Sequence, residues 1–344
     1  MKAAIYYGKD DIRIEDVQKP EIGPGELLLR VRGCGLCGSD IAKIVQGTVE
    51  PPAVLGHEVV GVVAEVGDGV EGFKLGDRVV AAHHVPCGQC HYCRHGNYSM
   101  CPTFKATKLD PGGFAEYVRL SASHVAHTTL HIPADLSDEE ASFTEPLACC
   151  LRGIKRSPPQ EGDTVLIVGA GSIGLLMLQL ARIQGARVMV TDLIEGRLDL
   201  ARSLGTDLAL NAKGDVATTV SQFTAGRGVD VVILTAGAAE PVAQALDYVR
   251  NGGVINIFAG TPPRSSVHLD INRIYHQEIT ILGSYSSSPL ELREALGLLT
   301  EGAVRVEGLV THRLPLTALP HAIELARRHE ALKVFITMEG LWRR

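Results

Sequence analysis

The sequence has no uninterrupted apolar run long enough to cross a membrane. Its most apolar stretch, Val165 to Ala181, contains three glycines, a serine and a glutamine. It is also shorter than the roughly 20 residues that a membrane-spanning helix needs, and we interpret it as a buried strand followed by a helix. The amino terminus, MKAAIYYGKDDIRIED, has no apolar core of signal-peptide length. We therefore expect neither a membrane partner nor secretion.

Clusters of basic residues are also missing. No run of Lys or Arg is longer than two residues, as in the terminal pair Arg343 and Arg344, and the formal net charge is −6. A protein of this sign repels the phosphate backbone of nucleic acids. The chain has no internal repeat and no low-complexity segment. We therefore expect a globular protein without a nucleic-acid partner.

The length of 344 residues predicts two domains, because one domain usually holds about 100–200 residues. Hydrophobic residues make up 45% of the chain and charged residues 21%, a balance typical of folded globular proteins. Up to about residue 140, short apolar runs alternate with turn residues, which indicates a β-rich fold. We place this first domain at residues 1–150.

Beyond residue 163, β-rich runs such as TVLIVGA and ARVMVTD alternate with helical patterns. About six such strands predict an α/β domain with a doubly wound parallel sheet over residues 151–285. Two amphipathic helices, near 290–300 and 316–328, precede a last strand, KVFITM. We expect this tail, residues 286–344, to pack back on the first domain.

A glycine motif stands where the first strand of the second domain ends. In VGAGSIG, Gly169 allows a tight turn, Gly171 lets the backbone approach a pyrophosphate, and Gly174 permits close packing of the helix. The helix begins with Ser172 and Ile173, and its free N–H groups and positive dipole end favour a phosphate. The strand before, the helix after and the spacing agree, so the motif predicts a dinucleotide site.

An acidic residue follows this motif at the position that selects the dinucleotide. Asp192 ends the strand RVMVTD, eighteen residues past Gly174. A carboxylate there accepts hydrogen bonds from both hydroxyls of the adenosine ribose and repels the 2′-phosphate of NADP. The sequence therefore favours NAD.

Four cysteines lie within fifteen residues in CGQCHYCRHGNYSMC, at Cys87, Cys90, Cys93 and Cys101. Four thiolates can surround one Zn²⁺ tetrahedrally, and such closed sites are structural. The spacing of the first three is also that of a ferredoxin-like iron–sulfur run, although the long final gap favours zinc. Thiolates held by metal fit a reducing cytoplasm better than a disulfide framework.

A second set of metal-binding residue types lies upstream, with Cys37 in GLCGSD and His57 and Glu58 in LGHEVVG. Three protein ligands and one open position are what a catalytic zinc requires, because a substrate oxygen must reach the metal. These residue types are common, and a GHE sequence alone is typical of a turn. Upstream of a dinucleotide motif, they predict a zinc-dependent, nicotinamide-linked dehydrogenase.

Taken together, these blocks resemble the zinc-containing medium-chain dehydrogenases over essentially the whole chain. CGSD, GHE, the four cysteines and VGAGSIG occur in that family's order and spacing, and GDRVV and GGFAEY are also similar to its members. Glu145 and Pro146, in FTEPLACC, resemble the polyol branch, that of sorbitol dehydrogenase, galactitol-1-phosphate dehydrogenase and threonine 3-dehydrogenase. The ethanol-type enzymes have a cysteine ligand in this region.

The resemblance implies a GroES-like β-barrel for the first domain, homodimers or homotetramers, and two zinc ions per chain. It places Cys37, His57 and Glu58 on the catalytic zinc, with Glu145 bound directly or through water. Asp40 would orient the histidine. Ser39 would accept the hydrogen bond of the substrate hydroxyl and relay its proton. The further residues implied at the cofactor are Arg197, Gly260, Ser284 and Tyr285.

Some positions depart from the family pattern. Sorbitol and threonine dehydrogenases have a proton-relaying histidine where this chain has Ala42, so the proton must leave through water, Lys43 or another route. Sorbitol enzymes carry an Arg-Tyr pair that contacts substrate where this chain has Ser284 and Tyr285. His84 matches a histidine that threonine dehydrogenases place near the substrate, although a loop histidine is the commoner case.

We therefore expect an enzyme that oxidises a secondary alcohol of a polyol, cyclitol or sugar alcohol to a ketone, with Zn²⁺ stabilising the alkoxide and NAD accepting the hydride. The main alternative is oxidation of a hydroxy-amino acid, as in L-threonine 3-dehydrogenase. A zinc-free C=C reductase would lack this ligand set, and a non-catalytic NAD-binding sensor would be expected to lose a ligand or the relay hydroxyl. A phosphorylated substrate would need a basic pocket, which a sequence does not reveal.

Overall fold

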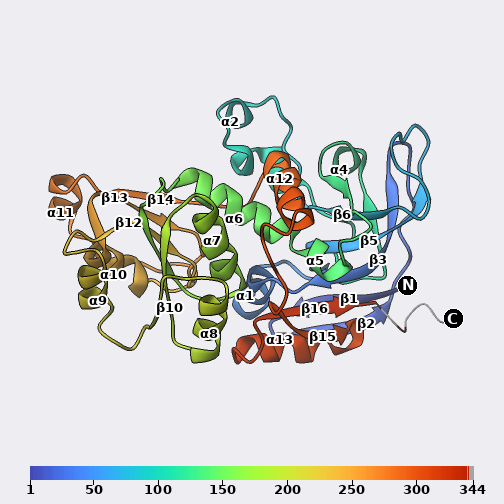
Figure 1. The fold of residues 1–344 in the computed structure, drawn as a ribbon. Coiled ribbons are helices and arrows are strands. Elements are labelled where there is room, and N and C mark those ends of the chain that lie inside the picture. Colours follow the sequence, from blue (N-terminus) through green and yellow to red (C-terminus); the bar gives the residue numbers. More distant parts are fainter. Residues whose placement is uncertain (339, 341–344) are drawn as a thin grey trace. The chain divides into compact units, whose positions relative to one another are not determined.

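The computed structural model describes residues 1–338 and residue 340. The chain divides into two compact units, one made of residues 1–148 with the segment from Ser287 onward and the other of Cys149–Ser286. The first unit contains two β-sheets and the second unit contains one (Figure 1). In the described residues, no helix combines the length and the apolar character that a membrane span requires.

The first unit contains a seven-stranded sheet in the order β15-β16-β3-β5-β6-β8, with β7 also paired to β3, and a three-stranded sheet in the order β2-β1-β4. Its strands are β1 (Lys2–Gly8), β2 (Asp11–Asp16), β3 (Leu27–Gly35), β4 (Ala53–Val54), β5 (Glu58–Val66), β6 (Arg78–Ala81), β7 (Tyr117–Leu120), β8 (Thr129–His131), β15 (Val310–Pro315) and β16 (Lys333–Thr337). Its helices are α1 (Gly38–Gln46), α2 (His91–Arg94), α3 (Pro102–Ala106), α4 (Ala122–His127), α5 (Asp138–Ser142), α12 (Pro289–Thr300) and α13 (Leu319–Arg327).

The carboxy-terminal segment returns to the first unit through its last strand. β16 pairs antiparallel with β3, and its Val334 and Ile336 join the buried cluster that includes Leu27, Leu29 and Val31 of β3. Alternate residues of a strand point to one face, so both strands present their apolar face to the same core. β16 of the carboxy-terminal segment is therefore part of the sheet and of the core of the first unit.

The tail helix predicted near 316–328 is divided. A short 3₁₀ turn covers Leu316–Ala318, and α13 begins only at Leu319. Pro320 lies in the first turn of α13, where its missing N–H costs no intrahelical hydrogen bond. Proline therefore fixes the helix start three residues later than the apolar pattern predicts.

The second unit is a six-stranded parallel sheet in the order β11-β10-β9-β12-β13-β14, the predicted doubly wound arrangement. Its strands are β9 (Thr164–Val168), β10 (Arg187–Asp192), β11 (Leu208–Asn211), β12 (Val229–Leu234), β13 (Val249–Ile257) and β14 (Thr280–Gly283). Its helices include α7 (Ser172–Ile183), α8 (Glu195–Ser203), α9 (Val216–Phe223), α10 (Glu240–Tyr248) and α11 (Ile271–His276). Figure 1 shows α7 and α8 on one side of this sheet and α9 and α10 on the other.

Three elements of this unit, β11, α9 and α11, were not assigned by the sequence patterns. The edge strand β11 has only four residues, none of them fully buried, so it lacks the apolar run of a central strand. The helix α9 carries adjacent threonines in VATTVSQF, and β-branched residues are weak helix formers. Packing of Val216 and Val220 in the unit's core stabilises this helix where local propensity does not.

Candidate active site and metal centres

The four cysteines of the loop around α2 converge on one point. Their sulfur atoms all lie within 4.8 Å of one another, with 3.6 Å between Cys90 and Cys93 and 3.6 Å between Cys87 and Cys101. Zinc–sulfur bonds of ~2.3 Å place tetrahedral ligands about 3.8 Å apart. A cluster of several iron atoms would hold the thiolates farther apart, so the loop fits one zinc ion.

The loop also prepares one of its thiols to bind metal. Burial raises the pKa of Cys101, but N–H groups of Cys87 and Phe104 outweigh it and lower that pKa to about 6. The Cys87 N–H donates to the Cys101 sulfur over 3.4 Å. Since the thiolate is the form that binds metal, these backbone donors favour the ligand state.

The second metal-binding set is assembled by the pairing of β3 with β5. The two strands are antiparallel, and Gly35 at the end of β3 faces Glu58 at the start of β5. Cys37 follows β3 by two residues and His57 directly precedes β5. As a result, ligand atoms of Cys37, His57 and Glu58 all lie within 4.8 Å of one another.

The close approach of the two strands requires a glycine. A Cβ atom at Gly35 would lie 1.9 Å from Oε2 of Glu58. Only a residue without a side chain leaves room for that carboxylate. Gly35, the first glycine of CGLCGSD, thus has a structural role that the motif alone does not indicate.

His57 is held by the carboxylate predicted to orient it. Asp40 Oδ1 lies 3.2 Å from Nδ1 of His57, and both side chains are buried. Burial lowers the pKa of His57, but the Asp40 carboxylate raises it well above its usual value. With Nδ1 engaged, Nε2 is the ring nitrogen left to bind a metal, and the carboxylate strengthens it as a donor.

Buried oxygens at this site fit a cation. Glu58 is 1% exposed, and among the described residues its Oε1 has no hydrogen-bond donor. Oδ2 of Asp40 is in the same condition. A buried carboxylate without a donor is costly unless a positive charge faces it, so this donor set fits a divalent metal ion.

A lysine that the sequence patterns did not indicate completes the site. Lys333 is the first residue of β16, is 5% exposed and contacts the carboxylate of Glu58. Burial lowers the pKa of Lys333, but Glu58 raises it above its usual value. No sequence motif marks a single lysine at the start of the last strand, so this ion pair becomes visible only in the folded structure.

Glu145 lies near this site but outside the ligand group. It belongs to the first turn of α6 (Thr144–Arg156), and its carboxylate is not among the ligand atoms that meet within 4.8 Å. Glu145 and Glu58 line the same small cavity. This placement leaves both predicted modes open, direct binding and binding through water.

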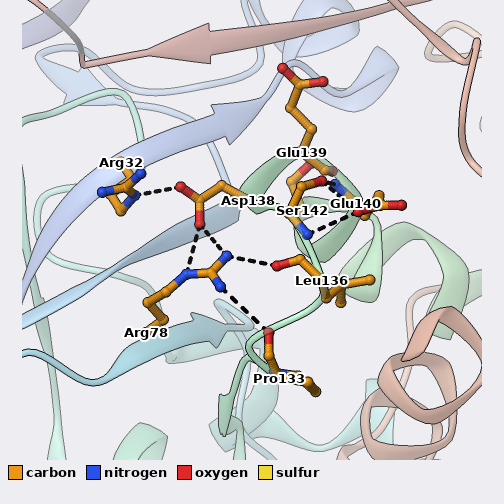
Figure 2. A network of polar contacts seen from close by, with 9 residues as sticks. Arg32, Arg78, Pro133, Leu136, Asp138, Glu139, Glu140 and Ser142 are labelled. Carbon is orange, nitrogen blue, oxygen red and sulfur yellow. Dashed lines mark hydrogen bonds and ion pairs between the residues drawn. The ribbon is translucent and has the colours of Figure 1, made fainter. Parts of the chain in front are cut away.

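A polar network fixes the segment that leads to Glu145 (Figure 2). The Asp138 carboxylate accepts hydrogen bonds from Arg32 of β3 and, over 2.7 Å, from Arg78 of β6. The Arg78 guanidinium also donates to the carbonyl oxygen of Leu136 over 2.8 Å. Because two strands of the sheet hold the start of α5, the following α6 begins at a defined position.

The predicted relay hydroxyl lies beside Cys37, one of the candidate metal ligands. Ser39 is exposed, and its Oγ is 3.3 Å from the sulfur of Cys37. Both loop histidines are also close to the site, since the ring of His83 lies 4.6 Å from that of His57 and 3.8 Å from that of His84. The tertiary structure thus brings the predicted serine and His84 to one region of the first unit.

The glycine motif forms a tight strand-to-helix turn in the second unit. Gly169 has a φ of 107°, and a Cβ atom at Gly174 would lie 1.9 Å from the carbonyl oxygen of Gly169. A Cβ atom at Gly171 would meet nothing within 4 Å. The turn is therefore closed on its protein side and open where a pyrophosphate would lie, at the start of α7 that includes Ser172 and Ile173.

The carboxylate of Asp192 is fixed by backbone donors. It accepts hydrogen bonds from the N–H of Ala170 over 2.7 Å and of Ile194 over 2.9 Å. Arg197 lies 3.9 Å from it. The contact with Ala170 ties the acid to the glycine turn, which gives the carboxylate a defined position beside the predicted pyrophosphate site.

The other residues predicted at the cofactor have different surroundings. Ser284 is buried and donates its hydroxyl to Oδ1 of Asn256 over 2.9 Å. Tyr285 is 56% exposed, and a Cβ atom at Gly260 would meet open space. The hydroxyl of Ser284 is thus engaged in the unit's core, whereas the other two positions are accessible.

Comparison with known proteins supports both halves of this description. The model of the alcohol dehydrogenase GroES-like domain matches residues 23–132, and that of the zinc-binding dehydrogenase matches residues 172–301. A sorbitol dehydrogenase from Halalkalibacterium halodurans is 34% identical, with 98% of this chain and 99% of that protein covered. The chain belongs to the zinc-containing medium-chain alcohol dehydrogenases.

Other members of the family are similar over their full length. A D-arabitol-phosphate dehydrogenase from Enterococcus avium is 36% identical, with 96% of this chain and 94% of that protein covered. The crystal structure of a zinc-binding dehydrogenase from Sinorhizobium meliloti, bound to NADP, has a TM-score of 0.89 at 33% identity and covers 98% of each chain. Membership confirms the predicted fold class, a Rossmann sheet with a GroES-like domain, and the predicted enzyme class, an NAD(P)- and zinc-dependent dehydrogenase of small-molecule alcohols.

Proposed function

We propose that this dehydrogenase oxidises a secondary hydroxyl of a polyol, cyclitol or sugar alcohol to a ketone and transfers the hydride to NAD. The observation that carries the proposal is the convergence of Cys37, His57 and Glu58 within 4.8 Å. His57 and Asp40 also line a pocket of about 860 Å³. A pocket of this size accepts a substrate much larger than a short aliphatic alcohol.

The roles of the side chains follow from their positions. Cys37, His57 and Glu58 would hold the catalytic zinc, while Asp40 keeps the imidazole oriented through Nδ1. Zinc bound there would act as a Lewis acid toward the alcohol, and bound NAD would take up the hydride. Ser39 is exposed beside Cys37 and would accept the hydrogen bond of the substrate hydroxyl. We propose that its proton then leaves through water or Lys43, since Ala42 offers no ionisable group.

The other predicted ligands have supporting roles in this proposal. The four-cysteine loop would hold a second, structural zinc, because all four positions of a tetrahedral ion are filled by protein. Glu145 would bind the catalytic zinc directly or through water. In the second unit, the glycine turn and Asp192 would hold the pyrophosphate and the adenosine ribose of NAD. Arg197, Gly260 and Tyr285 would contribute further cofactor contacts.

Metal analysis combined with NAD reduction tests the proposal. Protein purified without added metal would be assayed for zinc per chain and for turnover of polyols, cyclitols and L-threonine. Two zinc ions and turnover of a polyol or cyclitol are the expected result. A clear preference for L-threonine would favour the hydroxy-amino acid alternative. NAD binding without turnover of any alcohol would favour a sensor.

We also propose that the enzyme is a homodimer or homotetramer in the cytoplasm. β14 lies at one edge of the parallel sheet, and an open edge can pair with a second copy. All eight cysteines are free thiols, which fits a reducing compartment. Light scattering coupled to size-exclusion chromatography would give the number of chains, and a monomer would contradict the proposal.

A further inference from the structure

Three neighbouring strands of the parallel sheet end beside the glycine turn. β9 lies between β10 and β12, and the three strands are in register at their carboxyl ends. Asp192 is the last residue of β10, whereas Gly169 and Thr235 directly follow β9 and β12. The turn is therefore bordered by a carboxylate from one flanking strand and by a hydroxyl from the other.

The hydroxyl of Thr235 donates a hydrogen bond into the turn. Its Oγ1 lies 2.9 Å from the carbonyl oxygen of Gly169 and 3.0 Å from that of Val168. The Val168 oxygen already accepts the backbone N–H of Thr235 over 3.0 Å, and a hydroxyl has one hydrogen to donate. Donation to Gly169 therefore adds a partner to an oxygen on the protein side of the turn, where a Cβ atom at Gly174 would lie 1.9 Å from it.

The carboxylate of Asp192 holds the other end of the same peptide unit. The carbonyl group of Gly169 and the N–H of Ala170 belong to one planar peptide. That N–H donates to Oδ2 of Asp192 over 2.7 Å, whereas the oxygen faces Thr235. Side chains from the two strands that flank β9 thus fix both polar groups of a single peptide.

This peptide needs such support because it follows a glycine. Gly169 has a φ of 107°, and glycine changes its backbone angles at a lower cost than other residues. The C=O and N–H of a trans peptide point in opposite directions. Rotation by half a turn would therefore aim the Gly169 oxygen at the Asp192 carboxylate, on the side where we place the adenosine ribose. The two oxygens would repel each other and displace the carboxylate.

Holding the peptide does not use up the carboxylate of Asp192. Its two oxygens accept the N–H groups of Ala170 and Ile194, and each carboxylate oxygen has about two lone-pair sites. Each oxygen can therefore accept a further hydrogen bond from a ribose hydroxyl. The same side chain can hold the turn and bind the cofactor.

We propose that Thr235 is a positioning residue for NAD, which acts through the peptide between Gly169 and Ala170. Its hydroxyl and the Asp192 carboxylate hold this peptide so that the open side of the turn receives the pyrophosphate and the carboxylate receives the ribose. The inference rests on the dinucleotide site of the proposed function and adds a residue from outside the glycine motif. The cofactor site thus depends on the strand order β10-β9-β12 as well as on the motif.

Binding of NADH to the zinc-loaded protein tests the inference without turnover. Thr235→Val removes the hydroxyl with little change of shape and should raise the Kd for NADH about tenfold, the factor expected for the loss of one partly buried hydrogen bond. Thr235→Ser keeps the hydroxyl, so its Kd should stay within about twofold of the parent value. An unchanged Kd in Thr235→Val, measured by fluorescence titration, would overturn the inference.

Thr206 supplies a matched control in the same unit. Its hydroxyl also donates to two backbone carbonyl oxygens, those of Val188 over 2.8 Å and of Leu208 over 3.2 Å, but near the amino-terminal end of β10. Thr206→Val should lower the free energy of unfolding as Thr235→Val does and leave the Kd for NADH unchanged. An equal rise of Kd in both variants would indicate a general loosening of the unit and contradict the role of Thr235.

Hydrogen exchange distinguishes action through the turn from direct contact with the cofactor. In protein without NAD, the segment 168–174 should exchange about tenfold faster in Thr235→Val than in the parent or in Thr206→Val, because its peptide is held less well. Mass spectrometry of proteolytic fragments measures this rate. A weaker Kd with unchanged exchange would mean that the hydroxyl contacts the cofactor itself, and the inference would be wrong.

Turnover separates failure of this inference from failure of the proposed function. With an alcohol that is oxidised, Thr235→Val should raise KM for NAD about tenfold and leave kcat within about twofold. If no alcohol is oxidised, but Kd and exchange change as expected, the inference stands and the proposed reaction fails. If an alcohol is oxidised and Thr235→Val changes neither KM nor Kd, the inference fails and the proposed function stands.

Discussion

The two candidate metal centres of the first unit differ in how much of the chain builds them. The four cysteines of the candidate structural centre all lie within the fifteen residues from Cys87 to Cys101. In the candidate catalytic centre, Cys37 follows β3 by two residues, His57 directly precedes β5, and Glu58 is the first residue of β5. One centre is a property of a loop, whereas the other exists only when two strands pair in one register.

The two centres also differ in how charge is balanced. The loop centre holds four thiol groups around one point. The catalytic centre holds the buried carboxylate of Glu58, which already contacts Lys333 from β16. The four-cysteine centre, which we call the loop centre, should therefore affect mainly the stability of its own loop. The centre of Cys37, His57 and Glu58, which we call the assembled centre, should link metal binding and turnover to the packing of the carboxy-terminal segment.

Removal of the assembled centre should have the largest effect on the reaction. Cys37→Ala should lower turnover about 10³-fold or more, because the zinc loses a ligand that no neighbouring side chain replaces. NAD affinity, measured by fluorescence titration, should stay within about twofold, since the glycine turn lies in the other unit. If this variant kept the wild-type rate, zinc catalysis at this site would be wrong.

Loss of the buried lysine should test whether the tail and the catalytic centre are coupled. Lys333→Met leaves Glu58 buried without its cation and should lower the free energy of unfolding by about 3–5 kcal/mol in a Cys37→Ala background, which binds the ion weakly. The loss should be smaller in the zinc-loaded parent, because the metal then faces the carboxylate. Denaturant titrations of both pairs measure this difference, and Lys333→Arg, which keeps the charge, is the control. Equal losses in the two backgrounds would show that zinc and Lys333 act independently.

Disruption of the loop centre should have a smaller effect and a different readout. Cys93→Ser should remove one zinc ion per chain and lower Tm by about 5–10 °C, the shift expected for a few kcal/mol in a unit of this size. Turnover per zinc-loaded catalytic site should change only a few-fold. A loss of turnover as large as that of Cys37→Ala would mean that the two centres are not separable.

The smallest expected effect concerns cofactor selectivity in the second unit. There the glycine turn is formed by neighbouring residues, whereas Asp192 belongs to the next strand, β10. Asp192→Ala should reduce the ratio of kcat/KM for NAD to that for NADP about tenfold, because the repulsion of a 2′-phosphate is lost. Asp192→Asn keeps an acceptor for the N–H of Ala170 but removes the charge, so it separates the turn contact from the selectivity. An unchanged ratio in both variants would remove Asp192 from this role.

The outcome of the sequence analysis follows the same division. The glycine turn and most of the alternation of strands and helices in the second unit depend on neighbouring residues, and the sequence predicted both. β11 was missed because it is short and has no fully buried residue, and α9 was missed because its threonines are weak helix formers. Packing against the core of the unit stabilises both. The predicted start of the tail helix was too early because the apolar periodicity takes no account of Pro320, which lies in the first turn of α13.

The sequence by itself determined the loop of four cysteines, the dinucleotide turn and the family, because residues a few positions apart are held together by the chain in any fold. Only the tertiary structure decided that Gly35 leaves space for Glu58, that Lys333 faces this carboxylate, and that Thr235 and Asp192 hold one peptide of the glycine turn. The physical reason is that these groups meet through strand pairing and loop packing. A buried charge acquires its partner from whichever strand lies beside it, and sequence spacing does not record that neighbour.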